Sequence, residues 1–241
     1  MKRGELIEDL RLRNRTFVFK DRDHAGTLLA EKLAEYTGKE VVLFAIPAGG
    51  VPIAAVLSKR LQVPFDVLVV RKIHIPWNRE AGFGAVSWDG TIRFNEPLLA
   101  LLGLTENEIA RCIAAEKEEI EKRMRLFRGQ KPFPDISGKI AIVVDDGIAS
   151  GFTMLVAISS LKKKEPKEII IAVPTASMSA IQMMSTEVDK IVCLNIREGR
   201  TFAVADAYKK WYDLENEDVV KILKEAVSTK FSFSFFYYIF I

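Results

Sequence analysis

The chain has 241 residues, of which 49% are hydrophobic and 28% charged, so it can build a packed core and is not globally disordered. Its 35 Lys and Arg against 32 Asp and Glu leave a formal charge of +3, too small and too evenly spread to favour nucleic acid as a partner. Two distant cysteines, Cys112 and Cys193, and only two histidines argue against a disulfide framework, a thiolate zinc site or a metal cluster.

The first residues are charged and amphipathic, without the apolar core of a signal peptide, which predicts a reducing, cytoplasmic location. Residues 41–46 form an apolar run typical of a buried strand, and a helical pattern over 51–61 follows Pro47-Ala48-Gly49-Gly50. Continuous β-branched runs that alternate with helices indicate a parallel sheet covered on both faces. The fold class is therefore α/β, with a doubly wound and mostly parallel sheet. Further strands are predicted at 67–70, 140–144, 169–173 and 190–194, and helices at about 152–164 and 177–186.

Residues 73–135 interrupt this alternation, because they contain no comparable buried strand run. They do contain a well-marked helix, which begins at Thr105 and Glu108 with capping-box spacing and ends at Gly129, a typical C-cap residue. We interpret residues 73–135 as an inserted flexible loop and helical hood on a single domain of residues 15–225.

The segment from Ile140 to Thr153 carries the strongest chemical signal. A buried strand delivers two adjacent carboxylates, Asp145 and Asp146, at its carboxyl end, and small or hydroxylated residues lead from them into a helix. Carboxyl ends of parallel strands are where open α/β sheets bind ligands, and a helix N-terminus presents unpaired amides to a phosphate. The simpler alternative is an ordinary strand-to-helix turn with Ser150 as the N-cap. The apolar run, the two acids and the Ala-Ser-Gly-x-Thr ending in one register favour the phosphate site.

This segment resembles the motif with which type I phosphoribosyltransferases bind phosphoribosyl pyrophosphate (PRPP), and the resemblance covers roughly residues 15–225. It implies that Asp145 and Asp146 are catalytic, contacting the ribose hydroxyls and stabilising positive charge at C1′. It also implies that the phosphate loop wraps the 5′-phosphate; its residues are Ala149, Ser150, Gly151, Phe152 and Thr153. Gly147 stands where the family commonly has an aliphatic residue, and Phe152 where a small one is frequent.

The resemblance extends to a pyrophosphate site. The segment after the strand at 41–46 has the glycines that converging backbone amides require, although Ala48 replaces a larger polar residue of many relatives. Arg71 and Lys72 resemble a basic pair of adenine-type members and could supply positive charge; for Lys72, a strand end facing water is an equal alternative. The pyrophosphate site is thus predicted at Ala48, Gly49, Gly50, Arg71 and Lys72. Residues 75–86, with Arg79 and Glu80, would be the mobile loop that closes over the reactants.

Two C-terminal segments are less informative. Residues 202–212 are aromatic enough to stack a planar base, but their spacing favours an ordinary packed helix. The aromatic tail, residues 226–241, has only eleven residues beyond Lys230, whereas a membrane-spanning helix needs about 20. An edge strand, a docked tail or a disordered terminus is favoured over a membrane span, and such a tail can support a homo-oligomer.

The resemblance implies transfer of the phosphoribosyl group from PRPP to a purine or pyrimidine, with Mg²⁺ carried by PRPP rather than held in a protein cage. It places the chain in nucleotide metabolism. One alternative is a regulatory module that binds PRPP or a nucleotide without catalysis, which the alanine at position 48 favours. A hydrolase that uses Asp145 as nucleophile is disfavoured, because the neighbouring strands end in Pro47, Arg71 and Pro174 rather than in further acids.

Overall fold

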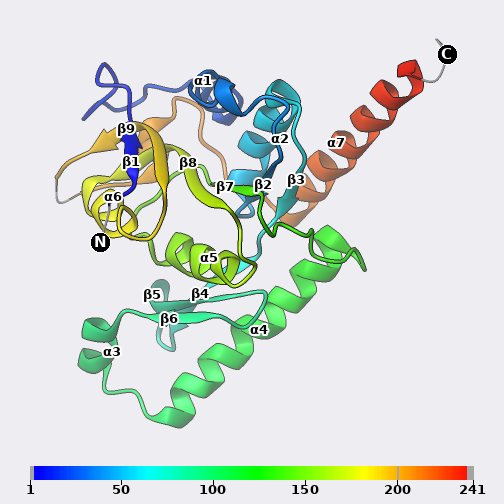
Figure 1. Ribbon diagram of the computed structural model, residues 1–241. Coiled ribbons are helices and arrows are strands. Elements are labelled where there is room, and N and C mark those ends of the chain that lie inside the picture. Colours follow the sequence, from blue (N-terminus) through cyan, green and yellow to red (C-terminus); the bar gives the residue numbers. More distant parts are fainter. Residues whose placement is uncertain (1–2, 200, 238–241) are drawn as a thin grey trace.

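The computed structural model describes residues 3–199 and 201–237, and its centre is a six-stranded sheet (Figure 1). The strand order is β1-β9-β8-β7-β2-β3, and every neighbouring pair is parallel. The predicted α/β class with a mostly parallel sheet is confirmed. The strands are β1 (Glu5–Ile7), β2 (Val41–Ala45), β3 (Phe65–Val67), β7 (Ile140–Val144), β8 (Glu168–Ser177) and β9 (Lys190–Arg197).

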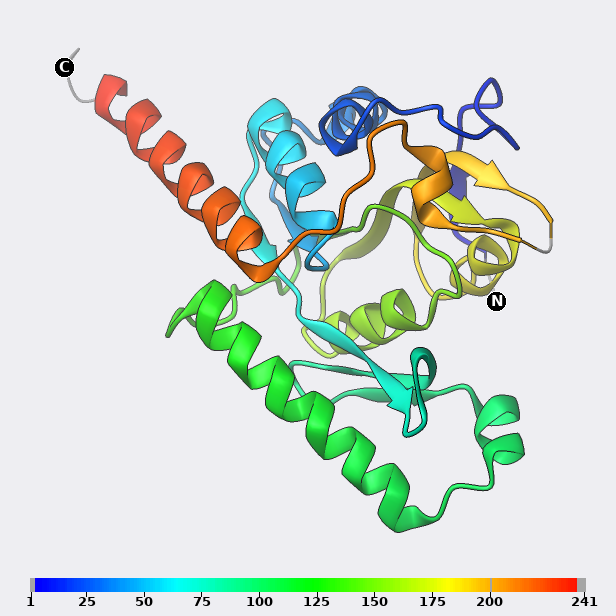
Figure 2. The same ribbon diagram turned by 180° about the vertical axis from the view of Figure 1, so that it is seen from behind.

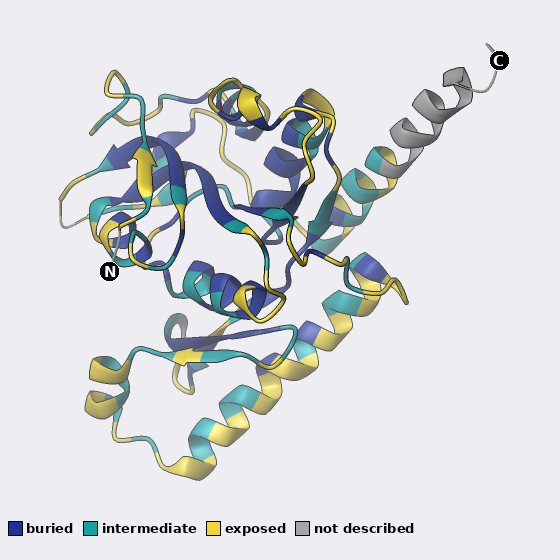
Figure 3. Cartoon of the chain, viewed as in Figure 1, coloured by how far each residue is buried: buried dark blue, intermediate teal, exposed yellow. Residues whose placement is uncertain are grey.

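Helices cover both faces of this sheet because alternate residues of each strand point to opposite sides. Leu43 and Val144 pack in the cluster that includes α1 (Arg22–Lys32) and α2 (Gly50–Leu61). Phe44 and Val143 pack in the cluster that includes α5 (Phe152–Lys162) and α6 (Met178–Met184). Buried residues accordingly concentrate in the strands and in the helix faces turned toward them (Figure 3). A short 3₁₀ turn, η1 (Ala34–Tyr36), follows α1.

The hood contains a second sheet that the sequence analysis did not predict. Its order is β4-β5-β6, all antiparallel, and α3 (Glu96–Leu102) and α4 (Glu106–Arg128) follow it (Figure 2). The expectation of an insertion without strands, with residues 75–86 as a loop, is therefore corrected: these residues lie in a hairpin. Gly82 and Gly84 interrupt the apolar pattern by which a strand is recognised in the sequence. The packing requires them, because a Cβ at 82 would lie 2.2 Å from Lys72 Cγ and one at 84 would lie 2.7 Å from the Arg93 carbonyl oxygen. The strands are β4 (Val70–Ile75), β5 (Asn78–Ser87) and β6 (Ile92–Phe94).

The strand predicted at 67–70 is divided between the two sheets. The Leu68 amide donates to the Ala45 carbonyl of the central sheet, whereas the Val69 carbonyl accepts from the Trp88 amide at the end of the hairpin. The chain thus passes from one sheet to the other within this single apolar run. The predicted capping box is confirmed, since Thr105 and Glu108 exchange both hydrogen bonds at the start of α4.

Two sets of ion pairs attach α4 to the strands. At its end, Arg128 donates from Nε and Nη2 to the two carboxylate oxygens of Asp66, each at 2.9 Å, and from Nη2 to the Pro132 carbonyl. In its middle, Glu116 accepts from Arg71 at 2.9 Å and lies 2.6 Å from His74 Nδ1. The Arg128–Asp66 pair fixes the hood to β3 at the edge of the central sheet, whereas the Glu116 contacts join α4 to β4 within the hood.

The C-terminal part differs from expectation. Residues 202–212 do not form the expected packed helix; they contain only the 3₁₀ turn η2 (Val204–Ala207). The tail is not an edge strand up to Tyr237, because α7 (Asn216–Tyr237) continues through it and projects from the body of the molecule (Figure 1). Residues 238–241 lie outside the described part. Among the helices of the described residues, none is both long and apolar enough to cross a bilayer.

We predict that Arg128→Met lowers the free energy of unfolding by about 3 kcal/mol, because it leaves Asp66 without its guanidinium partner. The Arg128 side chain is 3% exposed and that of Asp66 is 26% exposed, so water can replace only part of the lost bonds. Urea unfolding measures the change. Lys122→Met, which breaks the exposed pairs with Glu118 and Glu119, is the control and should scarcely change stability. An equally small effect at Arg128 would contradict a structural role for this pair.

Candidate functional site

The phosphate loop is held against the end of β8. The Ile148 amide donates to the Thr175 carbonyl, and the Ser177 amide donates back to the Ile148 carbonyl, each at 3.0 Å. The Ser177 hydroxyl donates to the Ala149 carbonyl at 2.7 Å. These bonds fix the loop just before α5, whose first-turn amides have no acceptor within the helix. The structure thus presents a helix N-terminus at the predicted place.

The N-cap of α5 is Gly151, not the Ser150 that an ordinary turn would use. Gly151 has φ of +85°, a left-handed conformation that glycine adopts without a steric penalty, and it offers no side chain to cap the helix. Ala149 and Ser150 are exposed, and Phe152 and Thr153 are half-buried. A backbone cap of this kind leaves the helix end open to an anion.

The acid pair is electrostatically strained. The Asp146 amide donates to Asp145 Oδ1 at 2.8 Å, which restricts the orientation of the Asp145 carboxylate. Burial raises the pKa of Asp145 well above its usual range, and the neighbouring charge of Asp146 raises it further. Burial also raises the pKa of Asp146, although the Arg22 guanidinium acts in the opposite direction. Such paired, perturbed carboxylates are typical of functional sites.

Arg22 is a site residue that the sequence analysis missed. It begins α1, is 4% exposed, and donates to Asp146 Oδ2 from Nε at 2.9 Å and from Nη2 at 2.8 Å. A cation in the first turn of a helix is disfavoured by the helix dipole. That misplaced charge, directly after the N-cap residue Asp21, is the signal that could have pointed to a buried partner.

The glycine loop, residues 46–50, packs directly on the acid pair. The Ile46 amide donates to the Val144 carbonyl at 2.9 Å, and α2 begins at Gly50. A Cβ on Gly49 would lie 2.0 Å from Asp146 Oδ2, and one on Gly50 would lie 2.4 Å from the Val144 carbonyl oxygen. Only glycine fits at either position. The structure therefore brings the predicted residues Ala48, Gly49 and Gly50 beside Asp145 and Asp146, with the N-termini of α2 and α5 at one edge of the sheet.

Arg71 and Lys72 lie in the hood, on β4. Arg71 donates to Glu116, and the two residues line a cavity of about 480 Å³ with His74 and Cys112. The side-chain carbons of Lys72 lie against Gly82. The hydrogen bond to Glu116 thus joins Arg71 to α4 of the hood, and the role of Arg71 and Lys72 at pyrophosphate stays a prediction. The side chains of Arg79 and Glu80 lie outside the described part of the chain.

The covering segment, residues 204–212, crosses the acid pair from the other side. The Tyr208 hydroxyl donates to the Asp146 carbonyl at 2.6 Å, and the centre of the Trp211 ring lies 4.1 Å from the Arg22 guanidinium carbon. A Cβ on Gly147 would lie 2.6 Å from Val204 Cγ1, so Val204 fills the space of the aliphatic residue that is common in the motif. Stacking of a base on these aromatic residues stays a prediction.

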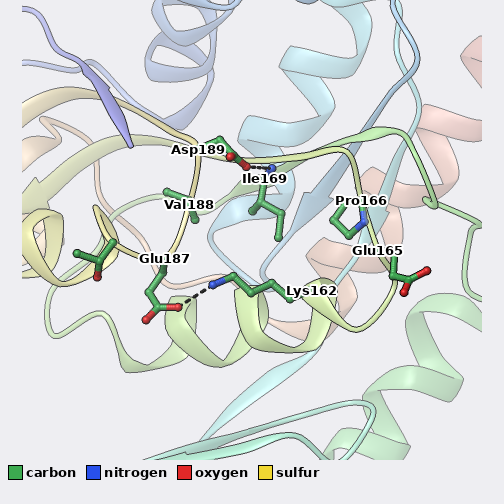
Figure 4. A pocket seen from close by; sticks show the side chains of 8 residues that line it. Lys162, Glu165, Pro166, Ile169, Glu187, Val188 and Asp189 are labelled. Carbon is green, nitrogen blue, oxygen red and sulfur yellow. Dashed lines mark hydrogen bonds and ion pairs between the residues drawn. The ribbon is translucent and has the colours of Figure 1, made fainter. Parts of the chain in front are cut away.

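A second hollow, of about 300 Å³, lies at the amino ends of the strands, opposite the candidate site (Figure 4). It is formed around Ile169, at the beginning of β8, where the Asp189 carboxylate accepts from the Ile169 amide, and an ion pair joins Lys162 to Glu187. This is the amino end of the strands, away from both helix N-termini. It does not belong to the candidate site.

Three comparisons with known proteins are informative. Residues 20–207 match the family model of the phosphoribosyl transferase domain. Two curated proteins of Mycobacterium tuberculosis, "Putative phosphoribosyl transferase MT0597" of strain CDC 1551 and its H37Rv counterpart Rv0571c, are each 34% identical over 212 residues. The match covers 87% of this chain and 47% of theirs, so the chain spans about half the length of these relatives. The crystal structure of TT1426 from Thermus thermophilus is 33% identical, with a TM-score of 0.70, over 86% of this chain and 98% of that one.

We predict that Asp145→Asn stabilises the protein at pH 7 by about 1–2 kcal/mol, the usual gain from relieving a functional site. Because the pKa of Asp145 is raised on folding, the folded state binds a proton more readily than the unfolded state. Stability should therefore rise as pH falls through the folded pKa, and the advantage of the asparagine variant should vanish near the ordinary pKa of 3.8.

Thermal unfolding of both proteins from pH 4 to pH 8 measures this difference. Asp9→Asn is the control with the opposite sign, since hydrogen bonds from Arg11 lower the pKa of Asp9 to about 2. That variant should lose stability at pH 7. An Asp145→Asn variant that is less stable than the wild type at pH 7 would show that the carboxylate supports the fold.

We also predict that Gly147→Ala destabilises by about 1–3 kcal/mol, because the added methyl group overlaps Val204. Adding Val204→Ala should recover part of this loss, and only part, because a Cβ at 147 also lies 2.9 Å from Thr175 Cγ2. A double-mutant cycle by urea unfolding measures the coupling. Strictly additive losses would mean that Val204 does not occupy this space.

Proposed function

The chain belongs to the phosphoribosyl transferase family, and from this premise we propose that it transfers the phosphoribosyl group of PRPP to a nitrogenous base and releases pyrophosphate. This makes it a pentosyltransferase, a glycosyltransferase-type enzyme. The observation that carries the proposal is the meeting of the acid pair, the phosphate loop and the glycine loop at one edge of the sheet.

Each part has a task that its physical properties suit. The phosphate loop and the N-terminus of α5 would bind the 5′-phosphate through backbone amides. The glycine loop would approach the pyrophosphate at Ala48 and Gly49, which are partly exposed, whereas Gly50 is buried and its amide already donates to the Ile46 carbonyl. The acid pair would contact the ribose hydroxyls between them. In this arrangement the two phosphate ends of PRPP would lie on either side of Asp145 and Asp146.

In the proposed step, a nitrogen of the base forms a bond to C1′ as the bond from C1′ to the pyrophosphate oxygen breaks. Pyrophosphate leaves with the electron pair, and the base loses the proton of that nitrogen to solvent or product. Positive charge grows on the ribose ring, and the negative acid pair would stabilise it in a site that is largely shielded from water. Positioning would supply much of the remaining acceleration.

Mg²⁺ is part of the proposal as a companion of PRPP. In the proposal, PRPP oxygens and water would supply the ligands of the ion. The bound ion would neutralise charge on the departing pyrophosphate. This chain's own contribution is the set of backbone amides that receives the phosphates.

A cytoplasmic location also belongs to the proposal. Both Cys112 and Cys193 carry free thiols, as is usual in a reducing compartment. The acceptor is a purine or pyrimidine base, and the variable hood and covering segment would select it. Self-association through the C-terminal tail stays a prediction.

The test is release of pyrophosphate from PRPP with Mg²⁺, measured against a panel of purine and pyrimidine bases. We expect release that depends on one base, and loss of at least a hundredfold in turnover for Asp145→Asn, which should remain folded. Saturable PRPP binding by calorimetry without release would support a PRPP-sensing module instead. Absence of both binding and release would overturn the assignment of the phosphate loop.

A further inference from the structure

Arg22 is placed where a charged residue is costly. Its side chain is 5% exposed, so it has lost most of its hydration, and it lies in the first turn of α1 near the positive end of the helix dipole. A buried ion pair of this kind adds little net stability compared with apolar residues of similar volume. Core packing therefore does not explain why an arginine occupies this position.

The contacts of Arg22 restrict one oxygen of the acid pair. Both Nε and Nη2 donate to Asp146 Oδ2. The backbone of Gly49 closes another side of Oδ2, since even a Cβ at that residue would overlap the oxygen. Asp146 is consequently held in one orientation by α1 and the glycine loop together.

The same guanidinium connects Asp146 to the covering segment. Arg22 Nη1 donates to the Tyr212 carbonyl at 2.9 Å, and the flat guanidinium lies over the Trp211 ring. The Tyr208 hydroxyl binds the Asp146 backbone, so this residue is tied to residues 208–212 through both its side chain and its main chain. The segment passes beside α1 and α2 on its way to α7 (Figure 2).

We propose that Arg22 is a positioning residue for phosphoribosyl transfer, which orients Asp146 toward PRPP and couples it to the covering segment. This inference rests on the function proposed above. Arg22 itself touches no reacting atom. It determines the direction of the carboxylate that does, so its removal should impair PRPP binding more than it impairs the fold.

Arg22 should also set the pH range of binding. The titratable groups that face Asp146 are Asp145 beside it, Arg22 from α1 and Tyr208 from the covering segment, and the glycine loop contributes none. Tyr208 stays neutral at ordinary pH, because burial raises its pKa well above its usual range. Arg22 is thus the cation that opposes protonation of Asp146. Without it, Asp146 should take up a proton at higher pH, and the acid-side loss of PRPP binding should move to higher pH.

The experiment is calorimetric titration of Mg²⁺ and PRPP into the protein from pH 5 to pH 8, for the wild type, Arg22→Met and Arg22→Lys. Arg128→Met is the matched control, since Arg128 is similarly buried and also donates two bonds to an aspartate, but belongs to the hood. Circular dichroism establishes that each variant is folded.

We expect Arg22→Met to weaken PRPP binding at least tenfold and to move the acid-side midpoint upward. Arg22→Lys keeps the charge without the planar two-bond geometry, so it should restore the midpoint and only part of the affinity. Arg128→Met should be destabilised yet bind PRPP as the wild type does. Wild-type affinity and pH dependence in Arg22→Met would overturn the inference, whereas a wild-type protein that binds no PRPP at any pH would overturn the proposed function itself.

Discussion

The ion pair between Asp146, buried at the end of a strand, and Arg22 is the interaction around which the site is arranged. Arg22 lies at the start of α1, and the chain that follows β9 places Trp211 on its guanidinium. Position 49 must be glycine, because a Cβ there would overlap Asp146. The three segments that enclose Asp146 come from distant parts of the domain. The site is therefore a product of the whole fold rather than of one motif.

The two sheets divide the work. The central sheet is parallel, and the carboxyl ends of its strands carry the acid pair and two helix N-termini, which the proposed function assigns to negatively charged ligand groups. The hood is an antiparallel layer with its own apolar cluster; Asp66–Arg128 attaches it to the central sheet, and Glu116 with Arg71 and His74 joins α4 to β4 within it. If the proposed function holds, ligand selection could change in the hood without disturbing the strands that would hold the phosphates.

The sequence predicted those features that are local. Runs such as residues 41–46 and 140–144 identify buried strands by composition alone, and the acid pair with its phosphate loop lies in one contiguous segment. Arg22 escaped because its partner is 124 residues away. The hairpin escaped because Gly82 and Gly84 break the apolar pattern, although close packing requires them. The covering segment looked helical because the spacing of its aromatic residues fits a helix, whereas in the fold these residues surround Arg22.

The pairing of β1 with β9 has a consequence for how the molecule is made. Glu5 lies opposite Lys190, so β1 finds its neighbour β9 only after most of the domain that follows β1 has been synthesised. Until then the edge of β8 stays open, and Arg22 lacks the covering segment. Contacts so distant along the chain also slow folding, because long loops must close first. For most of the synthesis of the domain, the nascent chain therefore lacks β9, the strand that joins β1 to β8 in the central sheet.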